Sequence, residues 1–208
     1  LDRGDTGRAA LSAPGYFGPG RGPANSLNAL VDAFRLTGDE RFARKASSLM
    51  RRVVHPADDI NERRLDDPEQ RWFYTMFFQS LGRFLQAKAE RREIDDDYAY
   101  GQASLLHYAR WMLDHEHPYL DRPERLEFPT ETWAAQDIRK SDVLALAALH
   151  ARGSERARLL DKARFFHRYS TTTLASSPTR TLTRPVVVLL TSGFVVSWVE
   201  RHPESAAA

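Results

Sequence analysis

The densest group of reactive side chains lies in the segment PTETWAAQDIRKSDVLALAALHA, residues 129–151. Its first half carries carboxylate, amide, indole and cationic groups, whereas its second half is almost entirely alanine, leucine and valine. We interpret the segment as a buried helix whose polar N-terminal end opens into a cavity. Because the N-terminus of a helix carries a partial positive charge, that end favours an anionic ligand.

The apolar residues recur at helical spacing along most of the chain, which predicts an all-α protein. Alternate helices differ in kind. The first, third, fifth and seventh are apolar over most of their surface, and the even ones are amphipathic with charged outer faces. Seven helices are predicted, at about residues 23–38, 39–54, 69–92, 96–114, 129–151, 155–169 and 185–200.

The predicted loops alternate as well, short from odd to even helices and long from even to odd. We interpret this as a weak repeat of helical hairpins that bury their faces against one another. Antiparallel hairpins would bring every long loop and every odd-helix N-terminus to one rim. Long loops without secondary structure are uncommon unless they are functional, so we expect the site on this rim.

Length and composition limit the classes that need considering. The 208 residues suit one domain, which we expect at residues 23–201, after a loop or upstream remnant at 1–22 and before a flexible tail at 202–208. The net charge of +2 is spread over interspersed charges, so we expect no nucleic-acid partner. No cysteine is present, which excludes disulfide and thiolate chemistry. The longest apolar run, 185–199, is interrupted by polar residues and is interpreted as a core helix, so no membrane partner is expected.

Alternating inner and outer helices with long loops on one rim are typical of an (α/α) toroid, of which this chain could form an incomplete arc. The segment GPGRGPANSLNALVDAFRLTGDERFARKA resembles hairpins of toroid polysaccharide lyases and uronate epimerases. PTETWAAQDIRKSDVLALAALH and TRPVVVLLTSG are similar to the C-terminal toroid domain of rhamnogalacturonan-lyase-like proteins of the PcRGLX/YetA type. In that group the toroid follows two β-rich domains, so the resemblance implies such domains as partners.

The resemblance implies uronate chemistry, in which a base abstracts a proton next to a carboxylate that other groups neutralise. The candidate catalytic residues are Tyr74, His115 and Asp137. The candidate substrate-binding residues share the predicted rim and are Arg21, Asn25, Arg71, Trp72, Glu131, Trp133, Gln136, Arg139 and Arg184. No metal ligand set and no cofactor motif is recognised.

Each candidate also has a purely structural interpretation. Asp137 could form an ion pair with Arg139 or Lys140, and Trp133, like Trp72, could pack in the core. Asn25 could satisfy first-turn amides, and a carboxylate in the first turn of a helix, such as Glu131, is favoured by the dipole. A histidine near a helix C-terminus, such as His115, could interact with the partial negative charge at that end of the dipole.

These observations predict a carbohydrate-active domain that acts on or binds an acidic, uronate-containing polysaccharide or oligosaccharide, with lyase-type β-elimination as the leading reaction. The alternatives are a noncatalytic helical glycan-binding or interaction domain of a larger protein, and a glycoside hydrolase or epimerase on the same scaffold. Self-association is a further expectation, because an arc would expose apolar inner helices. The compartment is unknown; no signal peptide is visible, and the resemblance favours a periplasmic or secreted protein.

Overall fold

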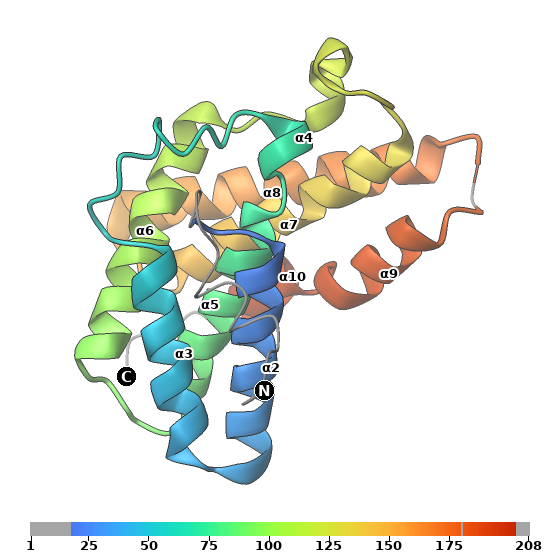
Figure 1. Cartoon of the computed structure of the whole chain (residues 1–208). Helices are drawn as coiled ribbons and strands as arrows, with labels where there is room; N and C mark the ends of the chain where they lie inside the picture. Colours follow the sequence, from blue (N-terminus) through green and yellow to red (C-terminus); the bar gives the residue numbers. More distant parts are fainter. Residues whose placement is uncertain (1–17, 180, 203–208) are drawn as a thin grey trace. The chain divides into compact units, whose positions relative to one another are not determined.

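The computed structural model describes residues 18–179 and 181–202, which form α-helices and no β-strand (Figure 1). The predicted all-α class is therefore confirmed, whereas the toroid-like arrangement stays a prediction. Residues 1–17 of the loop predicted at 1–22, and residues 203–208 of the predicted tail, lie outside the described residues.

The described chain divides into two compact units. Unit 1 comprises residues 18–64 and 73–108, and unit 2 comprises residues 65–72, 109–179 and 181–202. The single domain predicted over 23–201 stays a prediction.

Unit 1 contains the helices α2 (Arg21–Thr37), α3 (Glu40–Val53) and α5 (Tyr74–Glu90), and the larger part of α6 (Asp96–His115). Gly38 ends α2 with a left-handed φ of 67°, a conformation that glycine adopts without penalty. The Asp39 carboxylate then accepts a hydrogen bond from the Arg41 backbone amide at 2.9 Å and so caps α3. Both helix boundaries were predicted from the sequence.

Unit 2 contains α4 (Pro68–Arg71), the end of α6, two 3₁₀ turns η1 (Tyr119–Asp121) and η2 (Pro123–Arg125), and the helices α7 (Glu131–Ala148), α8 (Gly153–Ser176), α9 (Thr183–Ser192) and α10 (Val195–Arg201). Helix α7 is central, since it packs against α8, α9 and α10 (Figure 1). Fourteen of its 18 residues are buried, which confirms the predicted buried helix.

The helices predicted at 69–92 and 155–169 have different bounds in the structure. The helix predicted at 69–92 is interrupted at Trp72 and Phe73, where the chain passes from unit 2 to unit 1, and so forms α4 and α5. Helix α8 continues to Ser176 through a Ser/Thr-rich run that was predicted to be a loop. Two of its hydroxyl groups bond within the helix, since Thr171 Oγ1 donates to the His167 carbonyl at 2.9 Å and Ser176 Oγ to the Thr172 carbonyl at 3.0 Å.

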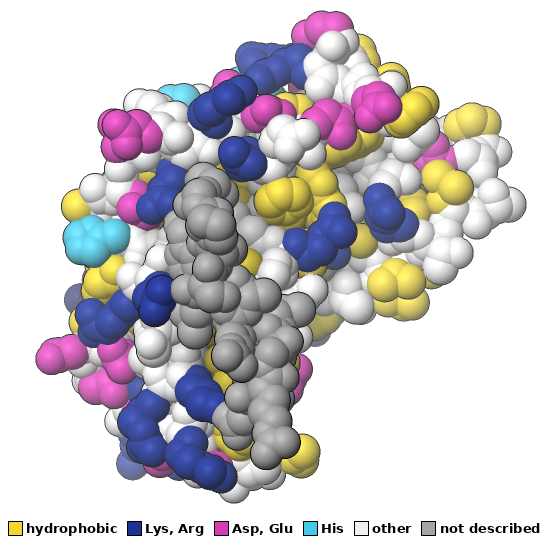
Figure 2. Space-filling view, in the orientation of Figure 1, with side chains coloured by type: hydrophobic (Ala, Val, Ile, Leu, Met, Phe, Trp, Pro, Cys, Tyr) yellow, Lys and Arg dark blue, Asp and Glu magenta, His cyan; other side chains and the backbone are white. Residues whose placement is uncertain are grey.

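The helix predicted in the core at 185–200 forms α9 and α10 and is buried on one face only. Val188 packs against Ala135 and Ile138 of α7, whereas Leu190 is 74% exposed and Phe194 is 57% exposed. Hydrophobic side chains accordingly reach the surface over α9 (Figure 2). By length and composition alone, Thr183–Arg201 is the one stretch of the described chain that could cross a membrane, and 28% of an 18-residue window within it is buried. The expected absence of a membrane partner stays a prediction.

Candidate functional site

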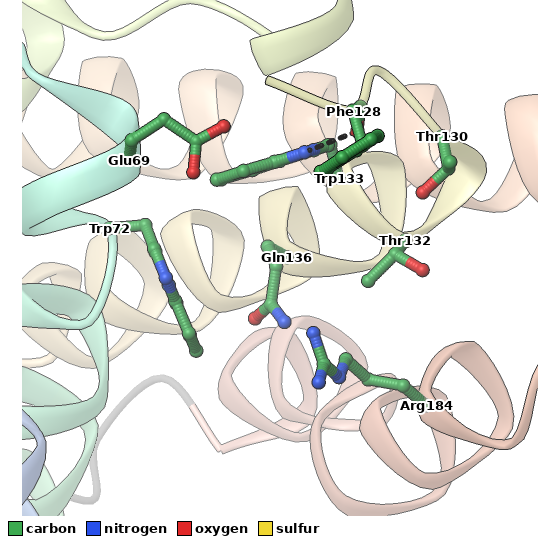
Figure 3. Close-up of a pocket in the computed structure, with 8 residues that line it drawn as sticks. All are labelled: Glu69, Trp72, Phe128, Thr130, Thr132, Trp133, Gln136 and Arg184. Carbon is green, nitrogen blue, oxygen red and sulfur yellow. Dashed lines mark hydrogen bonds between the residues drawn. The ribbon is translucent and has the colours of Figure 1, made fainter. Parts of the chain in front are cut away.

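A pocket of about 220 Å³ opens on unit 2 beside the N-terminal end of α7 (Figure 3). Four segments contribute to it: α4 with the residue that follows, the loop before α7, the first two turns of α7, and the start of α9. The lining residues are Glu69, Trp72, Phe128, Thr130, Thr132, Trp133, Gln136 and Arg184.

The loop before α7 is held in place by two hydrogen bonds. The Glu127 backbone amide donates to Glu69 Oε1 at 2.8 Å, which ties the loop to α4. The indole Nε1 of Trp133 donates to the Phe128 carbonyl at 3.0 Å, which ties the loop to α7. Because the Trp133 N–H is already used, this indole offers the pocket its carbon surface.

Three aromatic side chains form the apolar part of the pocket. Trp72 and Trp133 are half-buried and face the same cavity from different elements (Figure 3). Phe128 is 68% exposed at its edge. Aromatic groups beside a cavity offer flat, apolar contact area to a ring-shaped ligand, while their polar neighbours keep the rest of the cavity hydrated.

The polar end of the pocket is formed by Gln136 and Arg184, whose side chains point toward each other (Figure 3). Gln136 Oε1 accepts a hydrogen bond from Arg139 Nε at 2.9 Å, so the Gln136 amide group keeps its donors for other partners. The Arg184 guanidinium makes no ion pair within the described residues. A cation without a partner next to a free amide donor favours an anionic ligand.

The pKa of Arg139 gives a second sign of positive potential here. Burial lowers this pKa, the charge of Asp142 opposes the shift, and the nearby charge of Arg184 lowers it further. Two guanidinium groups that repel each other would both be stabilised by a bound carboxylate.

Five of the predicted binding residues are thus brought together in unit 2. Trp72, Trp133, Gln136 and Arg184 line the pocket, and Arg139 is bonded to Gln136. The other predicted residues of unit 2 lie outside the lining. Arg71 donates to the neighbouring Gln70 carbonyl, and Glu131 is the half-buried first residue of α7.

The remaining binding candidates and one catalytic candidate belong to unit 1. Arg21 and Asn25 are exposed on α2, where the Arg21 guanidinium lies 5.9 Å from the centre of the Phe73 ring. Tyr74 is fully buried at the start of α5. The structure therefore places none of these three residues in the pocket lining.

The other two catalytic candidates are in unit 2 but do not line the pocket. His115 stacks on Trp111 at the end of α6, with ring centres 4.9 Å apart, and its Nδ1 lies 2.9 Å from the Trp111 carbonyl oxygen. Asp137 is fully buried and pairs with Lys140, with 2.9 Å between Oδ1 and Nζ. Of the interpretations open for Asp137, an ion pair with Lys140 is therefore present.

Lys140 is the centre of a buried cluster. Its Nζ lies 2.7 Å from Glu116 Oε2, donates to the His117 carbonyl at 2.6 Å and sits 3.3 Å from the centre of the Tyr119 ring. Burial raises the pKa of Asp137 to about 6, although the charge of Lys140 and the hydrogen bond from the Tyr119 amide oppose the shift. Two carboxylates share one cation, so one of them retains a proton more readily than it would in water.

Four lining residues were missed by sequence reasoning. Thr130 and Thr132 flank the start of α7, and Glu69 lies in α4. For Phe128 a signal existed, because an aromatic residue directly before Pro129 in a polar loop has no helix face to pack against. No group of three His, Cys, Asp or Glu residues in the described chain could hold a metal ion.

Comparison with known proteins adds no identification. No protein-family model, no curated protein and no solved structure matches this chain. The resemblance to rhamnogalacturonan-lyase-like proteins therefore stays a prediction, and the pocket has to be interpreted from its own chemistry.

Proposed function

We propose that unit 2 binds an acidic, uronate-containing saccharide in the pocket beside α7. The observation that carries the proposal is the convergence of two indoles, the Gln136 amide and the Arg184 guanidinium, which has no ion-pair partner among the described residues, on one small cavity. The indoles suit the faces of a sugar ring, and the guanidinium suits its carboxylate.

The size of the pocket favours one sugar unit at a time. Its volume of about 220 Å³ is below the range of roughly 300–1,000 Å³ that is usual for drug-sized ligands. An oligosaccharide would place one uronate ring in the cavity, and its neighbouring rings would extend over the exposed Phe128.

Binding is better supported than β-elimination. Among the described residues, those that line the pocket include no tyrosine or histidine that could serve as the base, and Tyr74, His115 and Asp137 lie elsewhere. The lyase reaction, together with hydrolysis and epimerisation, therefore remains an expectation from the family resemblance. A helical glycan-binding domain is the function that the pocket supports best.

The test is a calorimetric titration of the chain with trigalacturonate and with a neutral galactose trimer. We expect binding of the acidic trimer, and we expect Arg184→Gln to weaken it about 10-fold, because a hydrogen bond to a charged group contributes roughly 1.5–3 kcal/mol and exposure reduces that value. The matched control is Arg168→Gln, which removes an exposed arginine from α8 and should leave the affinity unchanged.

Equal binding of the acidic and neutral trimers, or no binding of either, would refute the proposal. The same mixtures are followed for the ultraviolet absorbance of an unsaturated uronate. A rise in that absorbance would establish the lyase reaction instead of binding alone.

A further inference from the structure

The indole of Trp133 rests on Tyr119, a residue that does not itself line the pocket. The two ring centres are 5.1 Å apart, and the ring planes meet at 60°. A hydrogen bond from Nε1 to the Phe128 carbonyl also restrains the indole. Tyr119 is 9% exposed, so its ring fills the space behind the wall of the pocket.

Tyr119 is itself held from two sides by α7. Its backbone amide donates to Asp137 Oδ2 at 3.1 Å, and its ring lies 3.3 Å from Lys140 Nζ. A cation at that distance from a desolvated aromatic ring is attracted to the ring face. Lys140 also binds Glu116 and the His117 carbonyl, so the segment leading to Tyr119 is fixed to the helix at consecutive positions.

We propose that Tyr119 is a positioning residue for the saccharide pocket. The Lys140 cluster holds the Tyr119 ring, and this ring in turn holds the indole of Trp133. This inference rests on the proposed function. It assigns to the buried cluster a role beyond stability, namely keeping one aromatic wall of the pocket in its binding geometry.

The physical reason is the conformational entropy of the Trp133 indole, which forms one wall of the pocket. The segment between His117 and Glu131 contains only two short 3₁₀ turns, so few regular backbone hydrogen bonds restrain the residues that contact Trp133. An indole that is already fixed before binding loses little freedom when a sugar stacks on it. Without the Tyr119 ring, that freedom would be lost on binding, and the affinity would fall roughly three- to tenfold.

The experiment labels the four tryptophans with 5-fluorotryptophan and records fluorine NMR spectra without ligand. The Trp133 resonance is assigned with Trp133→Phe. In Tyr119→Phe the ring is retained, and we expect the Trp133 resonance to keep its position and width. In Tyr119→Leu the lost ring current shifts the resonance in any case, so the informative change is the broadening that we expect, while the resonances of Trp111 and Trp198, in the same unit, stay in place and report that the unit is folded.

A second pair of variants covers the case in which Tyr119→Leu unfolds the unit. Asp137→Asn keeps an oxygen that accepts from the Tyr119 amide, whereas Asp137→Ala removes it. We expect only Asp137→Ala to move the Trp133 resonance. An unbroadened Trp133 resonance in a folded Tyr119→Leu variant, or an unmoved one in Asp137→Ala where Tyr119→Leu does not fold, would overturn the inference.

Titrations of the same variants with trigalacturonate then test whether the position of the Trp133 indole affects binding. A weaker affinity in Tyr119→Leu with recovery in Tyr119→Phe is expected. If the unmodified chain does not bind trigalacturonate, the proposed function fails, while the ligand-free spectra still decide whether Tyr119 positions Trp133.

Discussion

Removing the Lys140 ammonium is the sharpest perturbation of unit 2. In Lys140→Met the side chain stays long and apolar, but Asp137 and Glu116 lose their shared cation. The side chains of Lys140 and Asp137 are both fully buried, and that of Glu116 is 8% exposed. Neither carboxylate can therefore turn to bulk water without opening the unit.

The expected loss follows from this burial. Breaking a buried ion pair by removing one partner costs about 3–5 kcal/mol, because an uncompensated charge remains inside. Asp137 can lower that cost by taking up a proton, since burial already raises its pKa to about 6. We therefore expect a loss of about 3–5 kcal/mol at pH 7.5 and a smaller loss at pH 5.

The sequence provides a selective assay. All four tryptophans of the chain, Trp72, Trp111, Trp133 and Trp198, lie in unit 2. Tryptophan fluorescence during urea unfolding therefore follows this unit, and the shift of the midpoint at constant slope gives the change in the free energy of unfolding. Arg168→Met, an exposed change on α8, is the control and should stay within about 0.5 kcal/mol of the unmodified chain.

A compensating triple variant separates the effect of the lost charge from the effect of altered packing. The triple variant Lys140→Met, Asp137→Asn, Glu116→Gln contains no buried charge in the cluster, and neutral replacements of buried ion pairs are often tolerated. It should be more stable than Lys140→Met alone. A loss of less than about 1 kcal/mol for Lys140→Met, typical of exposed pairs, or a triple variant no better than the single one, would refute this account of the cluster.

Two further predictions concern pH and the faces of α9. Because the pKa of Asp137 is raised by burial, its contribution to stability is complete below about pH 4 and is lost as the pH rises through about 6, on the order of 3 kcal/mol at about 1.4 kcal/mol per pKa unit. Burial also lowers the pKa of His150 to about 4, which destabilises the unit on acidification. The Asp137 contribution is therefore measured as the stability difference between the unmodified chain and Asp137→Asn in urea unfolding, and this difference should change by roughly 1.4 kcal/mol between pH 5 and 7.5. Identical pH profiles would contradict the prediction. On α9, Val188→Asp should cost more than about 3 kcal/mol and Leu190→Asp less than about 1 kcal/mol, because Val188 is buried and Leu190 is exposed; equal urea midpoints would show that the helix packs differently.

The helices were predictable where local signals determine them. Gly38 and Asp39 end one helix and cap the next, and the Ala/Leu/Val run 143–149 belongs to a buried helix, as expected. The break at Trp72 and Phe73 carries no Gly or Pro, because it arises where the chain changes from one unit to the other. Tertiary context, which the local sequence does not contain, determines that boundary.

The site was predictable for residues in the first turns of α7 and α9, whose positions follow from the helix starts. Trp133, Gln136 and Arg184 were placed on the predicted rim from these helix starts, and all three line one pocket, while their role in binding stays a prediction. Trp72 and Tyr74 are two residues apart in sequence but belong to different units, so one lines the pocket and the other is buried in unit 1. Sequence spacing alone cannot make that distinction.

Gln136 and Asp137 show why a cluster of reactive residues in sequence is not yet a site. They are adjacent, but each residue of an α-helix is turned by about 100° from the one before it. Gln136 consequently reaches the pocket, whereas Asp137 is enclosed by Lys140 and the amide of Tyr119. A catalytic acid or base must contact the substrate, so the catalytic role predicted for Asp137 would require this cluster to open. If Asp137 acts instead through Tyr119 on Trp133, it influences binding without any contact with the sugar, and Asp137→Asn should then preserve binding where Asp137→Ala weakens it.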